Sequence, residues 1–303
     1  MAERKQVRLG LVGYGEVGST LGRGLREAGL AQVASYDRYA FDGPFAGMIQ
    51  ERAAAAGVTL VRSPAELAAA ADLVLSVTPG SASLDSASGF ASVLGRGHTF
   101  LDLASATPKV KQGVAERLRS TGALVGDASI MGTPLNGYSM AMLSSGPAGP
   151  AMAEALVPWG MVIDYVGETL GTASGIKILR SVLFKGIEAL TDEMMLAARH
   201  YGLEEAVLAS AAKTLARPWT DTVNSLMPSG LIHAKRRAEE VEMAAEAVAD
   251  AGVEPIMTRS TVARLRWKEG LGLKEKLGGK MPANYRVALE ALAEGLARPP
   301  AKE

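Results

Sequence analysis

The chain has 303 residues, of which 48% are hydrophobic, and this is enough for two domains with apolar cores. Its 32 basic and 32 acidic side chains cancel, so no net charge indicates nucleic acid or an anionic membrane as a partner. Without cysteine there are no disulfides or thiol ligands, and with only three scattered histidines we expect no bound metal. No signal-peptide core or membrane-length apolar run occurs, which favours a cytoplasmic location.

A short apolar run, Val7 to Val12, predicts a buried first strand that ends in a glycine-rich turn. The turn reads Gly13-Tyr14-Gly15-Glu16-Val17-Gly18, and a helical pattern follows it. The first glycine permits a tight turn, the second leaves room for a pyrophosphate, and the third lets the helix pack closely on the sheet. Because the N-terminus of a helix also directs free N–H groups at phosphates, we assign these six residues to a dinucleotide site.

The second predicted strand, residues 32–37, ends in an acidic residue that bears on the choice of cofactor. The carboxylate of Asp37 is placed to bind ribose hydroxyls and would repel a 2′-phosphate, which favours NAD. Arg38 follows, however, and its guanidinium could bind that phosphate or stack on adenine. The sequence therefore favours NAD and leaves NADP open.

Up to residue 168 the patterns alternate between strands and helices. After Asp37, strands are predicted at 58–61, 72–78, 98–103, 123–128, 138–143 and 161–166, with helices at 44–56, from 64, and at 81–94, 108–120 and 147–157. Such alternation predicts a doubly wound, mainly parallel sheet, so we expect residues 1–168 to form an α/β Rossmann domain. Val77, Thr78 and Ser105 fall at the carboxyl ends of strands, where such sheets bind ligands, and we assign them to the cofactor site.

From residue 169 onward the sequence predicts helices only. The candidates are 174–201, 203–216, 218–227, 230–251, 258–270 and 284–297, punctuated by glycine and proline. Residues 169–303 are therefore expected to form an all-α domain for substrate binding and dimerisation.

A polar stripe runs along the first of these helices. Lys177, Ser181, Lys185, Glu188 and Asp192 recur at intervals of three or four in an otherwise apolar helix that we expect to be mostly buried. A salt-bridged face would explain Lys185 and Glu188. For Lys177, near the helix start, we favour a general acid/base that exchanges a proton with an alcohol oxygen during hydride transfer.

Two further candidates have alternative explanations that the sequence leaves open. Ser105 could hold a substrate carboxylate or hydroxyl, or it could cap the helix that starts near Pro108. His233 begins a basic cluster with residues 235–237, which is either a solvated face or a clamp for an anionic substrate.

Five segments, in this order, resemble motifs of the β-hydroxyacid dehydrogenase family, which includes 3-hydroxyisobutyrate and 6-phosphogluconate dehydrogenases. They are residues 10–18, 77–79, 102–108, 127–133 and 173–181. The resemblance implies a nicotinamide cofactor, a catalytic Lys177 and an association of subunits into a homodimer or homotetramer through the helical domain. The candidate substrate residues are Ser105, Met131, Gly132, Thr133, Arg180, Ser181, Lys185 and His233.

The chain departs from the family pattern around the substrate. Met131 and Thr133 stand where the family has serine and glycine, and Arg180 and Ser181 replace paired asparagines. It therefore resembles a divergent phosphogluconate dehydrogenase-like branch with its own C-terminal helical domain. We expect an NAD(P)-dependent dehydrogenase or reductase acting on the CH–OH group of a small hydroxy acid or sugar acid. An imine reductase, which typically has aspartate or tyrosine in place of Lys177, and a non-catalytic cofactor-binding sensor are the alternatives.

Overall fold

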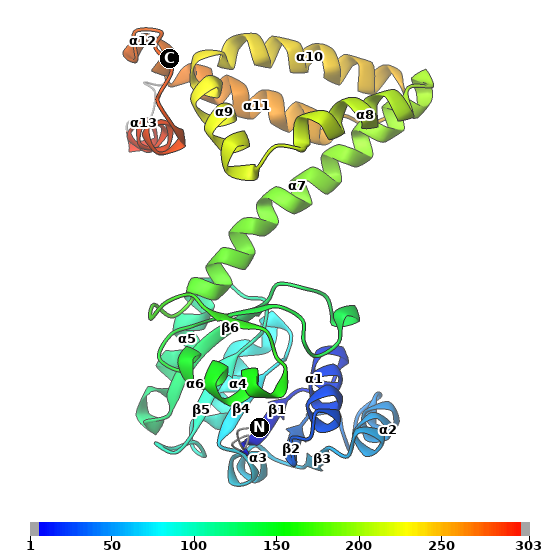
Figure 1. The fold of residues 1–303 in the computed structure, drawn as a ribbon, viewed down its shortest axis with the longest axis vertical. Coiled ribbons are helices and arrows are strands. Elements are labelled where there is room, and N and C mark those ends of the chain that lie inside the picture. The colour runs from blue at the N-terminus through cyan, green and yellow to red at the C-terminus, as the bar shows by residue number, and fades with distance from the viewer. Residues whose placement is uncertain (1–5, 298–303) are drawn as a thin grey trace. The chain divides into compact units, whose positions relative to one another are not determined.

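The computed structural model describes residues 6–297 (Figure 1). By its internal contacts the chain divides into two compact units, the first ending at Ser181 and the second beginning at Val182. The predicted boundary at residue 168 lies just before the long helix α7, Thr172–Tyr201, and the two compact units divide within that helix. The units are described separately below.

The first unit is built on one eight-stranded sheet among the described residues. Its strand order is β3-β2-β1-β4-β5-β6-β7-β8, and every neighbouring pair is parallel except β6 and β7. The strands are β1 (Arg8–Val12), β2 (Gln32–Tyr36), β3 (Thr59–Val61), β4 (Leu73–Ser76), β5 (Thr99–Asp102), β6 (Leu124–Ile130), β7 (Met142–Ser145) and β8 (Ile163–Tyr165). This is the doubly wound α/β arrangement that the sequence predicts.

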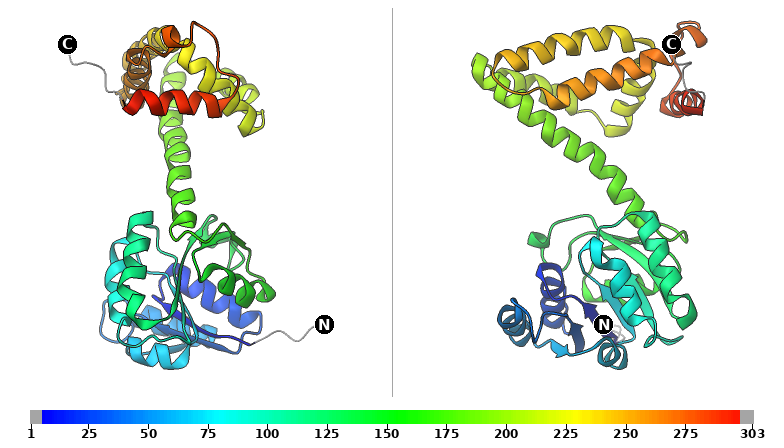
Figure 2. Two further views of the ribbon diagram at one scale, coloured as in Figure 1. Left: turned by 90° about the vertical axis from the view of Figure 1, so that its left-hand side faces the viewer. Right: turned by 180° about the vertical axis from the view of Figure 1, so that it is seen from behind.

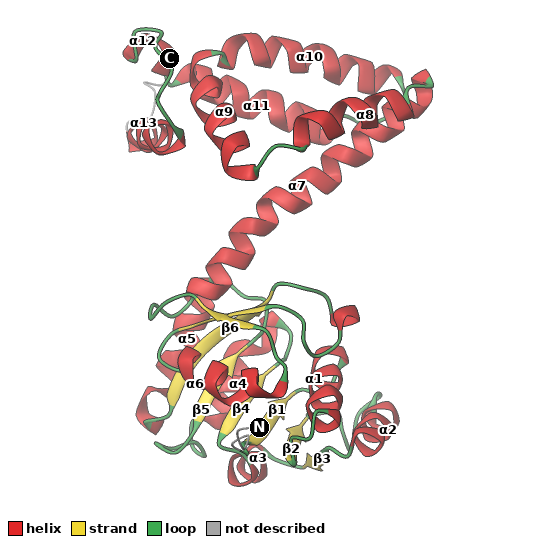
Figure 3. Cartoon of the chain, in the orientation of Figure 1, coloured by secondary structure: helices red, strands yellow, loops and turns green. Residues whose placement is uncertain are grey.

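Helices cover both faces of the sheet (Figure 3). They are α1 (Glu16–Glu27), α2 (Ala46–Ala56), α3 (Pro64–Ala70), α4 (Ser83–Phe90), α5 (Pro108–Leu118) and α6 (Gly149–Leu156). Helices α1, α2 and α6 share a core with Leu9 and Leu11 of β1, whereas α3, α4 and α5 pack on the opposite face with Val12. Because alternate residues of a strand face opposite sides, the apolar run of β1 is buried on both faces.

One strand of the first unit lies later in the chain than predicted. The prediction placed it at residues 138–143, but β7 spans Met142–Ser145. Tyr138 is the reason, because its ring packs against Gly24 of α1 and its hydroxyl approaches Gly160, while residues 137–140 form a turn. β propensity favours an aromatic residue in a strand, but Tyr138 instead packs between Gly24 and Gly160.

The described part of the second unit contains helices and no strand, as predicted. After α7 come α8 (Glu204–Leu215), α9 (Trp219–Ile232), α10 (Ala234–Asp250), α11 (Ile256–Gly270), the short α12 (Leu273–Lys276) and α13 (Tyr285–Ala297). Helices α10 and α11 lie side by side in the views of Figure 2. A small core brings together Leu231, Leu271, Leu273, Ala288 and Leu292.

The predicted helix break at Pro228 is wrong. Helix α9 continues through Pro228 to Ile232, and the chain breaks at His233 instead. Proline costs one backbone hydrogen bond inside a helix. Pro228, Leu231 and Ile232 are buried, however, and the last helical hydrogen bond of α9 runs from the His233 N–H to the Ser229 carbonyl. Burial of this apolar turn outweighs the local preference of proline.

The middle of α7 is more exposed than its apolar sequence predicts. Leu179 is 73% exposed and Val182 is 72% exposed. The pattern therefore predicted a burial that a single chain does not provide.

Candidate functional site

The glycine-rich turn after β1 has the geometry that its sequence predicts. Gly13 has a φ of +99°, a backbone conformation that side chains other than glycine rarely adopt, and its N–H donates to the Tyr36 carbonyl at 2.8 Å. A Cβ on Gly18 would lie 2.2 Å from the Gly13 carbonyl oxygen, so the close approach of α1 requires glycine there. A Cβ on Gly15 would meet no atom within 4 Å, because this side of the turn is open.

A cavity of about 1010 Å³ lies over this turn, at the carboxyl ends of β1, β2, β4 and β5. The order of strands changes direction between β1 and β4, and such a switch point is where doubly wound sheets bind ligands. The predicted cofactor residues that line the cavity are Gly13, Gly15, Glu16, Val17, Asp37, Arg38, Val77, Thr78 and Ser105.

Tyr14 and Gly18 were grouped with those residues but do not line the cavity. The side chain of Tyr14 is fully buried in the core beneath the turn, where it packs against Gly22. Gly18 is buried against the Gly13 backbone. A turn of this kind directs only some of its residues at the ligand, and the others pack against the sheet.

Asp37 is held in place by the backbone around it. Its Oδ2 accepts a hydrogen bond from the Tyr14 N–H and its Oδ1 accepts one from the Tyr39 N–H, both at 2.8 Å. Arg38 is exposed and stacks on the ring of Tyr39, with its guanidinium carbon 4.6 Å from the ring centroid. The carboxylate therefore has a fixed position at one end of the cavity, next to a cation that is exposed to solvent.

Lys177 lines the cavity from the first turns of α7. Its Nζ donates to Ser105 Oγ at 2.9 Å, so the two residues that sequence reasoning singled out meet at one point. Partial burial and the nearby ammonium of Lys111 lower the pKa of Lys177. The alternative for Ser105 as a helix cap is wrong, because Thr107 caps α5 through Val110 N–H.

A buried carboxylate anchors the helix that carries Lys177. Asp127, on β6, accepts hydrogen bonds from the Gly171 N–H at 2.8 Å, from the Ser174 N–H at 3.0 Å and from the hydroxyls of Ser145 and Ser174. A carboxylate at this end of a helix also matches the helix dipole. The resemblance placed this segment in the substrate site, whereas the Asp127 side chain holds the start of α7, a contact across more than 40 residues with no local sequence signal.

Sequence reasoning also missed the buried pair of Lys111 and Asp102. Lys111 Nζ lies 3.0 Å from Asp102 Oδ2, and both side chains are at most 1% exposed. The available signal was the position of Lys111 at helical spacing from Val114 and Leu118, two apolar residues of the same face of α5.

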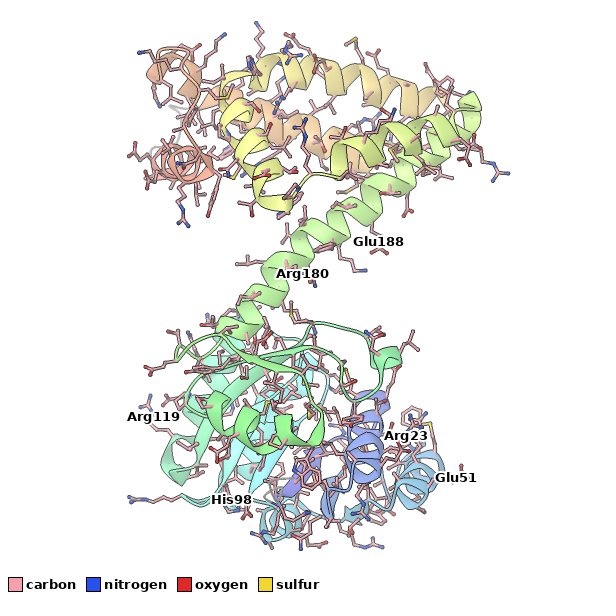
Figure 4. All side chains as sticks on the ribbon, viewed as in Figure 1. Arg23, Glu51, His98, Arg119, Arg180 and Glu188 are labelled. Carbon is pink, nitrogen blue, oxygen red and sulfur yellow. The ribbon has the colours of Figure 1, made fainter. Side chains whose placement is uncertain are left out.

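The remaining substrate candidates are distributed unevenly. Gly132 lines the cavity with Ser105 and Lys177, but Met131 and Thr133 do not. The Ser181 hydroxyl donates to the Lys177 carbonyl at 2.9 Å, and Arg180, which is labelled in Figure 4, is exposed on α7.

The two other candidates belong to the second unit. Lys185 forms an ion pair with Glu188 one turn along α7, which is the salt-bridged face that the sequence offered as an alternative. His233 lies between α9 and α10, and in the cluster that follows it Arg236 pairs with Glu240.

The described residues contain no group of acidic and histidine side chains suited to a metal ion. Among the same residues, no helix is both long enough and apolar enough to cross a membrane.

Comparison with known proteins agrees with this architecture. Residues 8–158 match the NAD binding domain of 6-phosphogluconate dehydrogenase, and residues 198–267 match a domain of unknown function, DUF1932. A conserved hypothetical protein from Sinorhizobium meliloti 1021 is 29% identical with a TM-score of 0.61, over 96% of this chain and 97% of that one.

Two further structures show the range of similar proteins. A conserved protein of unknown function, described as structurally similar to 3-hydroxyacid dehydrogenases, is 27% identical with a TM-score of 0.59, over 90% of this chain and all of that one. An imine reductase from Pseudomonas sp. has a TM-score of 0.69 at 19% identity, over 95% of this chain and all of that one, and this likeness concerns the fold. The chain thus joins a Rossmann domain that matches the NAD binding domain of 6-phosphogluconate dehydrogenase to a C-terminal region that matches DUF1932, in a fold like that of the 3-hydroxyacid dehydrogenases.

Proposed function

We propose that this protein is an NAD(P)-dependent oxidoreductase that interconverts an alcohol and a carbonyl on a small hydroxy acid or sugar acid. The observation that carries the proposal is the contact between Lys177 Nζ and Ser105 Oγ inside the cavity that begins at the glycine-rich turn. A lysine at this point supports the proposal, because its amine could exchange a proton with a substrate bound next to the reactive end of a dinucleotide.

The residues present suit a nicotinamide dinucleotide. The open side of Gly15 and the free N–H groups at the start of α1 would hold the pyrophosphate. Asp37 would accept hydrogen bonds from the adenosine ribose, and we favour NAD because its carboxylate is fixed there. Arg38 keeps NADP as the alternative. The cofactor would supply the hydride acceptor or donor.

Lys177 and Ser105 would divide the work on the substrate. In the direction of oxidation, neutral Lys177 takes the proton from the alcohol oxygen, and in reduction its ammonium returns a proton to the carbonyl oxygen. Its lowered pKa makes both forms accessible closer to neutral pH than an exposed lysine allows. Ser105 orients Lys177 and can also donate its hydroxyl proton to a substrate carboxylate.

The proposal names a class of substrate, a small hydroxy acid or sugar acid, and the residues that would contact it. We retain Ser105 and Gly132 as substrate-contacting residues because they line the cavity with Lys177. Arg180 and Ser181 stay candidates for the anionic end of the substrate because they lie about one turn after Lys177 on α7. Lys185 and His233, which belong to the second unit, stay predictions from the sequence.

Imine reduction is the second candidate, favoured by the fold of the imine reductases that resemble this chain. The two candidates predict different roles for Lys177. Titration with NADH and NADPH, followed by assays on panels of hydroxy acids and cyclic imines, separates them. Turnover of a hydroxy acid that is lost in Lys177→Ala supports the proposal. Turnover of imines alone, unchanged in Lys177→Ala, overturns it, and cofactor binding without any turnover favours a sensor.

We also infer that the protein is a homodimer or homotetramer. The exposed apolar side chains of α7, such as Leu179 and Val182, would be covered by a second copy of this chain.

A further inference from the structure

The fully buried ammonium of Lys111 is held by the turn that carries Ser105, the hydrogen-bond partner of Lys177. Lys111 Nζ donates to the backbone carbonyls of Asp102 at 2.9 Å and Ala104 at 2.6 Å, and forms the ion pair with Asp102. A lysine is rarely buried completely, because removing the charge from water is costly unless contacts compensate it. Here the acceptors are Asp102, the last residue of β5, and Ala104 in the turn that follows this strand.

That turn carries Ser105. Ala104, whose carbonyl Lys111 holds, is the residue directly before Ser105, and its N–H donates to Asp102 Oδ1 at 3.1 Å. On its other side the turn is fixed by Gly80, since a Cβ there would lie 2.1 Å from the Ser105 carbonyl oxygen. Lys111 therefore helps to determine where the Ser105 hydroxyl meets Lys177.

Charged side chains surround Lys111 on the side of the sheet and on the side of the cavity. Asp102 and Asp127 are register partners on β5 and β6, both buried, and both attract the Lys111 ammonium. The carboxylate of Asp127 accepts hydrogen bonds from the Gly171 and Ser174 N–H groups at the start of α7. On the cavity side Lys177 lies near Lys111, and repulsion between the two ammonium groups adds to burial in lowering the pKa of Lys177. Glu16 and Asp85 line the same cavity.

We propose that Lys111 is a positioning residue for proton exchange at Lys177. It holds the turn that carries Ser105 through the Ala104 carbonyl, and its ammonium, while charged, repels that of Lys177 and so favours the neutral form of Lys177. Burial lowers the pKa of Lys111 itself, while Asp102 and Asp127 oppose that shift. This inference rests on the proposed role of Lys177 and adds a second lysine that does not touch the substrate.

The test measures the ionisation of Lys177 directly. Lys111→Met alone would leave a buried, unpaired carboxylate and risks misfolding, so the variant is Lys111→Met with Asp102→Asn, which removes the pair together. Competitive acetylation with acetic anhydride is followed by mass spectrometry of the Lys177 peptide across neutral to alkaline pH, with exposed Lys213 as the internal reference. Ser105→Ala is the matched control, because it removes the hydroxyl and keeps the Lys111 charge.

In the wild type, Lys177 should become reactive at a lower pH than Lys213. In the double variant the midpoint for Lys177 should rise, so that its reactivity relative to Lys213 at mildly alkaline pH falls by about threefold or more, and by less in Ser105→Ala. An unchanged midpoint in a double variant that keeps the wild-type circular dichroism spectrum and NADH affinity overturns the proposal.

The outcome is separate from that of the proposed function. Acetylation reports the charge of Lys177 whether or not the protein turns over a hydroxy acid. Absence of turnover on every acid would defeat the proposed function and leave the shift in midpoint as a measured property of the site. An unshifted midpoint with normal turnover would defeat only the role of Lys111.

Discussion

At the scale of single residues, the proposed chemistry depends on the ammonium of Lys177 and the hydroxyl of Ser105. They come from α7 and from the turn after β5, which are 72 positions apart in the chain. Each was recognisable from the sequence, Ser105 because it follows a buried strand and Lys177 because it stands in an apolar helical pattern. The contact between Lys177 and Ser105 could not be predicted from the sequence, because it depends on how α7 packs on the sheet.

The pH dependence of turnover should follow the charge of Lys177. Oxidation needs the neutral amine, so kcat/KM for the hydroxy acid should rise as pH increases through the pKa of Lys177. Reduction needs the ammonium and should decline over the same range. Because burial and Lys111 lower that pKa, both transitions should lie below the range of an ordinary lysine. Initial rates in both directions check this, and an oxidation rate that falls with pH over this range would contradict it.

Replacement of Asp37 tests the preference of the site for NADH over NADPH. Replacing it with Asn keeps the shape and removes the charge, so NADH affinity should fall about tenfold, since hydrogen bonds to charged groups contribute roughly 1.5–3 kcal/mol. NADPH affinity should fall less or rise, because repulsion of the 2′-phosphate disappears. Fluorescence titration measures both, with exposed Asp42→Asn as the control. Equal losses for the two cofactors would show that Asp37 does not select between them.

At the scale of secondary-structure elements, the start of α7 is determined by a contact with the sheet. Asp127 holds Gly171, Ser174 and Ser145 through one buried carboxylate. Lys177 lies about one helical turn after Ser174, so the contact that holds the start of the helix also sets the position of the proposed acid/base.

Asp127→Ala should therefore destabilise the first unit. Two backbone N–H groups and two hydroxyls would lose their acceptor in a buried place, which should lower the free energy of unfolding by about 3 kcal/mol or more. Urea denaturation followed by circular dichroism measures the loss, and Asp164→Ala, at an exposed position of β8, is the control. A loss no larger than that of the control would mean that other contacts hold α7.

Local pattern predicted most elements because each strand and helix shows its own burial period. Leu9, Leu11 and Val12 identify β1 without reference to any other part of the chain. Where the prediction was wrong, a distant contact decided the structure. Tyr138 packs between Gly24 and Gly160 and displaces β7, and burial around Pro228 lets α9 continue. Lys111 and the contact of Asp127 with α7 were missed for the same reason, because the partners of both side chains are identified only by the fold.

At the scale of the whole molecule, the exposed apolar face of α7 predicts association. Leu179→Lys combined with Val182→Lys places two charges on that face and should convert the inferred dimer or tetramer into monomers. Size-exclusion chromatography with light scattering measures the mass, and Leu215→Lys, on exposed α8, is the control. A wild-type monomer, or a double variant of unchanged mass, would contradict the inference.

The role proposed for Lys177 is to exchange the proton that accompanies hydride transfer on an alcohol. The most direct measurement is kcat for wild type and Lys177→Met on the hydroxy acid that the substrate panel identifies, with NADH affinity measured in parallel. We predict that kcat falls by about 10²–10⁴-fold, the usual contribution of a general acid or base, while NADH affinity stays within about twofold. Retention of most of the activity in Lys177→Met would contradict the account.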